Sequence, residues 1–166
     1  ILMQQPEVLG HIGKLTMLQE LLLHLEIKGS ANHTTHDQAI QGVATGCVRL
    51  QKLTLRVHGT AGDVGLESIA ACVRLRELEL EGFANTDAAL ATVMHGCPLL
   101  SKIDFYNMAV GARTFHEVAR NGRMEEISMV AVSDGSWVSE INNVIRTCSS
   151  LKSLVLSNRI GFLNLT

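Results

Sequence analysis

Apolar residues recur along this chain in a fixed nine-residue pattern. Six segments carry apolar residues at their fourth, seventh and ninth places: 15–23, 47–55, 72–80, 97–105, 121–129 and 148–156. Successive segments start 32, 25, 25, 24 and 27 residues apart. The seventh and ninth places are two residues apart, which is the spacing of a β-strand with one buried face. The sequence therefore predicts six strands that recur at a nearly constant period.

Between these strands the apolar spacing changes to i, i+3, i+4, which gives a short helix one apolar face. The predicted faces are Ile40/Val43/Ala44, Leu66/Ile69/Ala70, Leu90/Val93/Met94, Phe115/Val118/Ala119 and Ile141/Val144/Ile145. Polar residues precede the helices at Thr35, Asp63, Thr86 and Ser136, and Thr35 with Gln38 has the spacing of a capping box. A unit of strand, loop and helix cannot bury its own apolar edge, so the units must stack with their strands in a parallel sheet.

The repeated unit has the pattern C-x-x-L-x-x-L-x-L and closes with T-D-x-A-L or G-D-V-G-L before a helix of small residues, as in residues 72–96. This pattern resembles the cysteine-containing subclass of leucine-rich repeats, a ribonuclease-inhibitor-like solenoid. The subclass is best known from F-box proteins, the substrate receptors of ubiquitin ligases. The resemblance covers nearly the whole chain. It implies an α/β horseshoe of about six repeats, with a parallel β-sheet on the concave face and helices on the convex face.

One position departs from the family pattern. The family usually places Cys or Asn three residues after the second strand leucine, where side chains bond to loop backbone. This chain has other residues there: Glu26, His58, Phe83, Met108, Val132 and Arg159. We therefore expect the loop backbone to find different partners.

The period also describes the domain organisation. Residues 1–166 form a single leucine-rich repeat domain in this interpretation. The segment from Pro6 to Ile12 precedes the first strand by the offset of a helix, so we expect an earlier unit. The helix after Leu156 would begin about where Thr166 ends the sequence. We predict that the chain is a fragment of a longer protein, with incomplete repeats at both ends.

Composition narrows the possible partners. Hydrophobic residues make up 46% of the chain, enough for a sizeable core. Fourteen Lys and Arg against sixteen Asp and Glu give a net charge of −2, without the broad basic field that attracts nucleic acid or an anionic membrane. No apolar run approaches the roughly 18–20 residues of a membrane span. We expect a protein partner, no nucleic acid and no membrane.

The four cysteines occupy one position of the repeat: Cys47, Cys72, Cys97 and Cys148. A metal site would need close pairs such as C-x-x-C, so thiols stacked in the core explain this spacing better. Four unpaired thiols indicate a reducing compartment, and we expect an intracellular protein, cytoplasmic or nuclear.

Candidate chemistry elsewhere in the chain is weak. His33, His36 and Asp37 could suggest a metal site, but a solvated loop leading into a helix cap explains them better because no further ligand is placed by the repeat. No Ser, Cys or His is set apart from its equivalents as a nucleophile or base would be. We expect no metal, no cofactor and no enzymatic activity.

The residues that flank the buried strand positions should point outward from the sheet. They form three columns: Glu20, Lys52, Glu77, Lys102, Glu126, Ser153; Leu22, Thr54, Glu79, Asp104, Ser128, Val155; and His24, Arg56, Glu81, Tyr106, Val130, Ser157. Charges in the first column alternate in sign, so neighbouring strands about 4.8 Å apart could pair. Glu79, Glu81 and Asp104 form an acidic group with few internal cations, next to Tyr106.

Two interpretations of this face remain open. In the first, it is a solvated surface with weak ion pairs. In the second, it binds a basic segment of a partner, with Tyr106 as an aromatic anchor. The predicted partner-binding residues are Lys52, Thr54, Arg56, Glu77, Glu79, Glu81, Lys102, Asp104, Tyr106, Glu126 and Ser128. The rim loops or Trp137 are the alternative location.

Three functions fit these features. The first is a protein–protein interaction scaffold, the substrate-recognition repeats of an F-box-type ubiquitin-ligase receptor, which would bind a ligase adaptor if an F-box lies outside this sequence. The second is a structural subunit or spacer of a large assembly. The third is the ligand-sensing repeat domain of an immune receptor, whose units near 28 residues fit less well.

Overall fold

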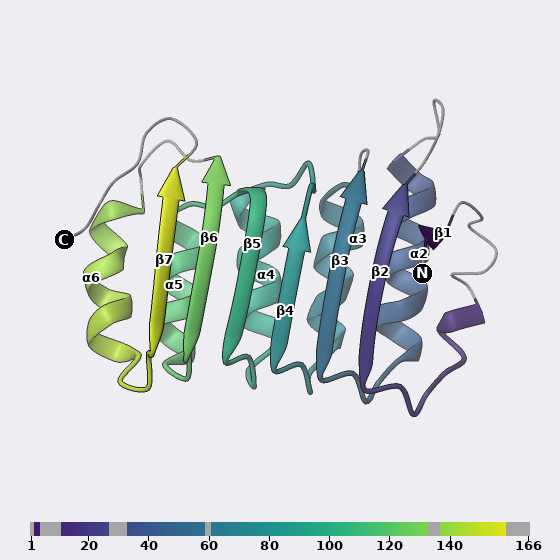
Figure 1. The fold of residues 1–166 in the computed structure, drawn as a ribbon, viewed down its shortest axis with the longest axis horizontal. Helices are drawn as coiled ribbons and strands as arrows, with labels where there is room; N and C mark the ends of the chain where they lie inside the picture. The colour runs from purple at the N-terminus through teal and green to yellow at the C-terminus, as the bar shows by residue number, and fades with distance from the viewer. Residues whose placement is uncertain (1, 4–10, 27–32, 59–60, 133–136, 159–166) are drawn as a thin grey trace.

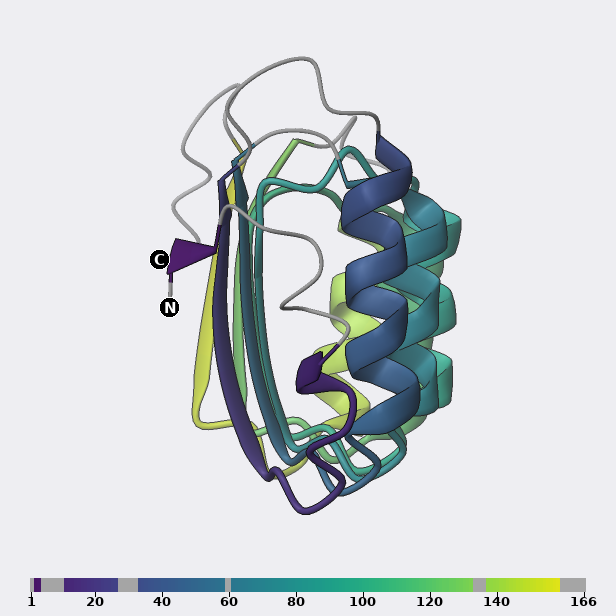
Figure 2. The ribbon, with the colours of Figure 1, turned by 90° about the vertical axis from the view of Figure 1, so that its right-hand side faces the viewer.

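Two layers make up the molecule, a parallel β-sheet and a row of helices that covers one face of it (Figures 1 and 2). The computed structural model describes residues 2–3, 11–26, 33–58, 61–132 and 137–158. Seven strands lie side by side in chain order, and every neighbouring pair is parallel. The predicted α/β class with one parallel sheet is confirmed.

The elements alternate along the chain as the period predicts. The strands are β1 (Leu2–Met3), β2 (Glu20–Glu26), β3 (Lys52–His58), β4 (Glu77–Glu81), β5 (Lys102–Ala109), β6 (Glu126–Val132) and β7 (Ser153–Asn158). The helices are α2 (His33–Gly46), α3 (Asp63–Ser68) with a 3-10 turn η1 (Ile69–Ala71), α4 (Asp87–Gly96), α5 (Ala112–Asn121) and α6 (Val138–Thr147). The six predicted strands are β2 to β7. Most of the predicted helix from Pro6, and Arg159, lie outside the described residues.

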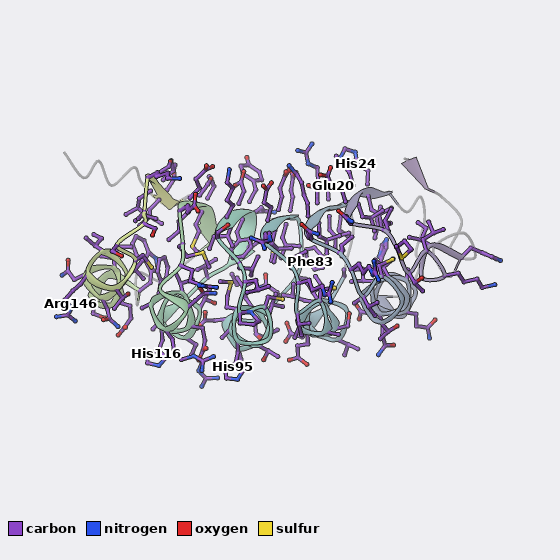
Figure 3. All side chains as sticks on the ribbon, turned by 90° about the horizontal axis from the view of Figure 1, so that it is seen from below. Glu20, His24, Phe83, His95, His116 and Arg146 are labelled. Carbon is purple, nitrogen blue, oxygen red and sulfur yellow. The ribbon has the colours of Figure 1, made fainter. Side chains whose placement is uncertain are left out.

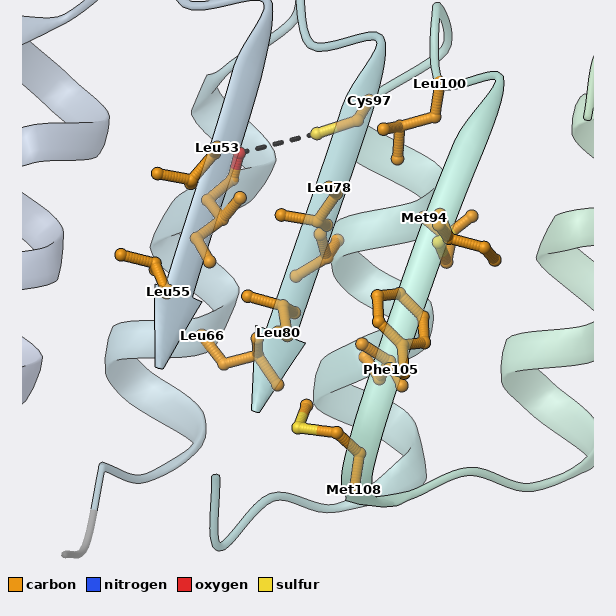
Figure 4. Close-up of a cluster of buried hydrophobic side chains, with 14 of the residues drawn as sticks. Leu53, Leu55, Leu66, Leu78, Leu80, Met94, Cys97, Leu100, Phe105 and Met108 are labelled. Atoms are coloured by element: carbon orange, nitrogen blue, oxygen red, sulfur yellow. Dashed lines mark hydrogen bonds between the residues drawn. The ribbon is translucent and has the colours of Figure 1, made fainter. Parts of the chain in front are cut away.

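The core lies between the sheet and the helices, and the predicted strand residues supply its sheet side (Figure 4). Leu78 and Leu80 of β4 and Ile103 and Phe105 of β5 are at most 2% exposed. They pack against helix residues that include Leu66 and Met94. Transfer of such side chains from water, at about 25 cal/mol per Å² of apolar surface, is the main force that holds the two layers together.

Three details of the predicted helices are wrong. Helix α3 begins at Asp63 itself, so Gly62 rather than Asp63 is its N-cap residue. Helix α2 begins at His33, so Thr35 lies inside its first turn rather than capping it. Ile145 is 53% exposed, because no helix of the described residues lies beyond α6 on that side (Figure 1). The N-cap at Thr86 is confirmed, since its side chain accepts a hydrogen bond from the backbone N–H of Ala89. Ser136 lies outside the described residues.

The four cysteines are buried and free, as predicted. Each thiol lies within hydrogen-bond range of a backbone carbonyl in the preceding helical segment: Cys47 with Ile12, Cys72 with Ala44, Cys97 with Ile69 and Cys148 with Val118. Figure 4 shows the third of these, at 3.4 Å. The cysteine thiol at this position of the repeat is therefore a weak hydrogen-bond donor that joins one unit to the unit before it.

The loop backbone finds its partners further along the chain than the family pattern places them. Phe83 and Met108, which occupy the departing position, are buried and extend the core. Asn85 instead bonds the backbone of Ala109 through both its amide oxygen and its amide nitrogen. Asp63 accepts hydrogen bonds from the backbone N–H and the hydroxyl of Thr86. Side chains of one unit thus hold the loop of the next.

One backbone irregularity follows strand β4 and another lies inside strand β5. Gly82 has φ +82°, and a Cβ there would overlap the carbonyl oxygen of Val57, so only glycine fits. Asn107 has φ 57° and is the extra residue of a β-bulge, since Tyr106 pairs with Val130 and Met108 pairs with Ala131. The bulge changes the alternation and turns Met108 into the core.

Among the described residues, no helix is long and apolar enough to cross a membrane.

Candidate functional site: the open face of the sheet

The open face, meaning the side of the sheet that no described helix covers, carries the three predicted columns. The strand register places Glu20, Lys52, Glu77, Lys102, Glu126 and Ser153 in one row, and the other two columns are equally in register. Glu20 and His24 lie on the open face in Figure 3, and His95, His116 and Arg146 lie on the outer side of the helices. The predicted orientation of the columns is confirmed.

Charges in the first column pair across strands, as their alternation predicts. Lys52 Nζ lies 2.9 Å from Glu77 Oε2, and Lys102 Nζ lies 2.9 Å from Glu126 Oε1. The hydrogen bond to Glu77 raises the pKa of Lys52, and the hydrogen bond to Glu126 raises the pKa of Lys102. All four side chains are substantially exposed, so water and salt screen these attractions.

Two members of the predicted acidic group, Glu79 and Glu81, are paired with a cation of the same face. Arg56 bonds Glu79 through Nε at 3.0 Å and through its terminal nitrogen at 2.5 Å. Its Nε also lies 3.6 Å from Glu81 Oε2. The hydrogen bond to Glu79 is the largest cause of the raised pKa of Arg56. The prediction of few internal cations was therefore wrong for Glu79 and Glu81, because one long guanidinium reaches two carboxylates on the neighbouring strand.

Thr54 is also not the surface residue that was predicted. It points to the open face but is 3% exposed, and its hydroxyl lies 3.4 Å from Glu79 Oε2. The short Thr54 side chain stands between the longer side chains of Leu22 and Glu79 on the neighbouring strands. Thr54 therefore supports Glu79 rather than offering a group to a partner.

Asp104 and Tyr106 of β5 remain available on the open face. Asp104 is exposed and makes no hydrogen bond or ion pair with any residue that the structure describes. Tyr106 is 46% exposed. A shallow groove of about 240 Å³ crosses the strands here, and its lining includes Thr54, Glu79, Asp104 and Ser128 together with four first-column residues, Lys52, Glu77, Lys102 and Glu126. A second hollow of about 280 Å³ is lined by Arg56, Glu79, Leu80, Glu81, Asp104 and Tyr106.

Asp104 and Glu79 both line the two hollows, but Asp104 is the more exposed of the two and Glu79 is paired with Arg56, so Asp104 is the carboxylate most open to a ligand on this face. Among the predicted residues on β3 to β6, five are acidic and three are basic: Glu77, Glu79, Glu81, Asp104 and Glu126 against Lys52, Arg56 and Lys102. The open face therefore keeps an excess of negative charge after its internal pairs are made. Such a surface suits a cationic group.

The second column also presents apolar residues at its two ends, which the predicted site left out. Leu22 on β2 is 51% exposed and Val155 on β7 is 50% exposed. Their positions in the second column could have identified both residues from the sequence, because the strand register aligns them with Asp104. An extended ligand that crosses the sheet would have apolar contacts on either side of the acidic centre.

Trp137 and the histidine pair near the start of α2 lie away from the open face. Trp137 is 6% exposed and stacks on Phe115 with ring centroids 5.4 Å apart, so it belongs to the core. His33, His36 and Asp37 lie within α2 rather than in a solvated loop, and Asp37 accepts a hydrogen bond from the backbone N–H of Gly62. Within the described part of the chain, no group of three or more His, Cys, Asp or Glu could hold a metal ion.

Comparison with known proteins agrees with this architecture. No family model matches the chain. The C-terminal domain of tropomodulin from Caenorhabditis elegans has a similar structure, with a TM-score of 0.54 over 89% of this chain and 93% of that domain. The fold is leucine-rich-repeat-like. The two sequences are 12% identical, so the likeness concerns the fold alone.

Proposed function

We propose that this chain is a protein-interaction module whose open face binds a basic segment of a partner protein. In this proposal the chain forms a horseshoe solenoid of about six leucine-rich repeats, and the open face is its concave side. Asp104 carries the proposal, because it is exposed, lines both hollows of the face and makes no hydrogen bond or ion pair with a described residue, with Arg56 attracting it only at longer range. The proposal gives the repeats no catalytic step and no cofactor.

The chemistry of the face favours an arginine-rich or lysine-rich segment that crosses the strands. A guanidinium can make two parallel hydrogen bonds to the Asp104 carboxylate. The ring of Tyr106 lies on the same strand and can take a second cation on its face. Leu22 and Val155 give apolar contacts at either end of the row. Electrostatic complementarity of this kind contributes mainly to association rate and partner selection.

The ion pairs within the open face limit which substitutions can test the proposal. Reversal of Glu79 or Glu81 would break their bonds to Arg56 as well as remove charge, so the two effects could not be separated. Asp104→Lys and Tyr106→Ala change exposed side chains and leave the ion pairs of the first column and of Arg56 in place. Glu67→Lys in α3 is the matched control, because Glu67 is an exposed acid on the helical layer.

The experiment measures binding of fluorescent peptides by anisotropy, with an Arg/Lys-rich peptide set and the same peptides with Gln in place of the cations. We expect the wild-type chain to prefer the cationic set. Asp104→Lys should weaken that binding at least tenfold and Glu67→Lys should leave it unchanged, with smaller differences at high salt. Equal binding by wild type and Asp104→Lys would contradict the proposal and favour a structural spacer.

We further propose that the repeats belong to the cysteine-containing subclass and serve as the substrate-recognition part of an F-box-type ubiquitin-ligase receptor inside the cell. The support is the shared role of the four cysteines, which each join one unit to the carbonyl of the unit before. Free thiols also suit a reducing compartment. The test is co-purification of the full-length protein with a ubiquitin-ligase adaptor. Its failure would remove the ligase assignment and leave the peptide-binding proposal intact.

A further inference from the structure

The loops that lead from each helix into the next strand meet at one edge of the molecule. They comprise residues 47–51, 72–76, 97–101, 122–125 and 148–152, and they lie along the lower edge in Figure 1. Backbone hydrogen bonds connect them in series, for example from Arg76 N to Gln51 O at 2.8 Å and from Ser101 N to Arg76 O at 2.9 Å. The edge is therefore a rigid continuation of the sheet.

The C-x-x-L pattern forms a tight turn in these loops. Leu50 N bonds Cys47 O, and Leu75 N bonds Cys72 O, each at 3.0 Å. The cysteine and the leucine are buried, so the two residues between them project outward. Val48 and Val73 are each 54% exposed, and the arginines that follow them are exposed as well.

Positive charge gathers along this edge. Six basic residues lie in the loops that precede β2 to β7: Lys14, Arg49, Arg74, Arg76, Arg123 and Lys152. The acidic residue in the same loops is Glu125, which pairs with Lys152 at 2.7 Å. That pairing lowers the pKa of Glu125. We call Arg49, Arg74, Arg76 and Arg123 the arginine rim.

The arginine rim is unusual because its guanidinium groups are not neutralised within the part of the chain that the structure describes. None of the four side chains makes a hydrogen bond or an ion pair there. Arg76 and Arg74 lie in the same loop, and Arg49 lies in the neighbouring one. Six of the fourteen Lys and Arg of the chain lie in these loops, whereas the open face has an excess of acids.

We propose that the arginine rim binds an acidic segment of a partner protein in extended conformation. Carboxylates of the segment would bond Arg49, Arg74 and Arg76 bidentately. Apolar side chains between those carboxylates would contact Val48 and Val73, which stand half-exposed beside the arginines. The occupant is thus of opposite charge to the one proposed for the open face.

A protein segment fits this edge better than a polyanionic surface. The rim is one row of cations, and the first column of the open face, with Glu77 and Glu126, begins immediately beyond the loops. A membrane or a nucleic acid duplex would extend over those acids and be repelled, since charges interact over about 8–10 Å at physiological salt. Valines on tight turns are also too short to insert into a bilayer, but they suit contact with a peptide.

The test uses the whole chain and a fluorescent peptide in which Glu and Asp alternate with Leu and Val. Its comparison probes are the same peptide with Gln and Asn for the acids, a 20-base-pair DNA duplex and vesicles that contain phosphatidylserine. The double variant Arg49→Glu/Arg74→Glu reverses the charge of two rim arginines in neighbouring loops. Arg113→Glu is the matched control, because Arg113 is an exposed arginine in α5 away from this edge.

We expect the wild-type chain to bind the acidic peptide, and the double variant to bind it at least tenfold more weakly at an unchanged unfolding midpoint. Arg113→Glu should bind like wild type. Binding of basic peptides to the open face should not fall in the double variant, which separates this proposal from the previous one. Stronger binding to DNA or vesicles than to the acidic peptide would overturn the proposal, as would equal binding by the double variant and wild type. Self-association that Asp104→Lys abolishes would also overturn it, by showing a second copy as the occupant.

Discussion

The carboxylate of Asp87 in α4 accepts hydrogen bonds from both the backbone N–H and the hydroxyl of Thr114 in α5, at 3.1 and 2.6 Å. The same carboxylate accepts from the backbone N–H groups of Gly111 and Arg113. Helix α5 starts after Gly111, which has no side chain to cap it. An aspartate from the preceding unit therefore satisfies N–H groups that a helix leaves unpaired at its N-terminus, and it also places a negative charge at the positive end of the helix dipole.

We predict that Asp87→Ala lowers the free energy of unfolding by about 1–3 kcal/mol, the cost of leaving partly buried donors without an acceptor. Urea titration followed by circular dichroism measures it. Asp104→Ala is the matched control and should change stability little, since Asp104 has no partner among the described residues. Equal effects of the two substitutions would mean that the cap between units contributes nothing.

Leu78→Ala should destabilise the chain by roughly 2–5 kcal/mol, because a central core position has little room to collapse around the cavity. Leu78 is 2% exposed in β4, between strands on both sides. Val73→Ala, at an exposed turn position, is the comparison and should have a small effect. A loss below about 1 kcal/mol for Leu78→Ala in denaturant titration would contradict the assigned burial.

Cys72 and Cys97 should react slowly with maleimide at pH 8 in the folded chain and rapidly in denaturant. Burial raises the pKa of Cys72 from its ordinary value of 9.0 to about 11 and that of Cys97 to about 12, so the reactive thiolate is scarce. Ser150→Cys places a thiol at an exposed turn corner and is the positive control. Labelling of Cys97 as fast as that control would show that the thiol is not in the core.

The same thiols predict a loss of stability in alkali. In the unfolded chain they ionise near pH 9.0, whereas in the folded chain they hold their protons to about pH 11–12. Their contribution to stability is therefore complete below pH 9 and falls as the pH rises from there. Urea midpoints measured from pH 7 to pH 11 should be flat and then decline. In Cys97→Ala the decline should be smaller.

Arg56→Gln should strengthen the binding of cationic peptides to the open face. The substitution frees Glu79 and Glu81 from their internal cation and leaves the buried Thr54 in place. Its effect on the unfolding midpoint should be small beside that of Leu78→Ala, because exposed ion pairs contribute little. Lys152→Gln, which removes a cation from the Glu125 pair at the edge, is the control. Weaker peptide binding by Arg56→Gln would contradict an acidic recognition face.

The sequence by itself determined the period, the strands and their register. Side-chain direction alternates with every residue of a strand, so Leu78 and Leu80 point inward and Glu77 and Glu79 outward wherever the strand lies. A repeat of about 25 residues then brings equivalent positions side by side, which is why all three columns of the open face were predicted. The buried cysteines followed from the same argument.

The tertiary structure decided which side chains meet, because that depends on side-chain length and on distances between units. The reach of Arg56 to two carboxylates left Asp104 as the free acid, and Thr54 was covered because it is short. The bulge at Asn107 changed the alternation that the sequence predicts. The arginine rim likewise required the fold, since residues about 25 apart became neighbours only when the loops stacked at one edge.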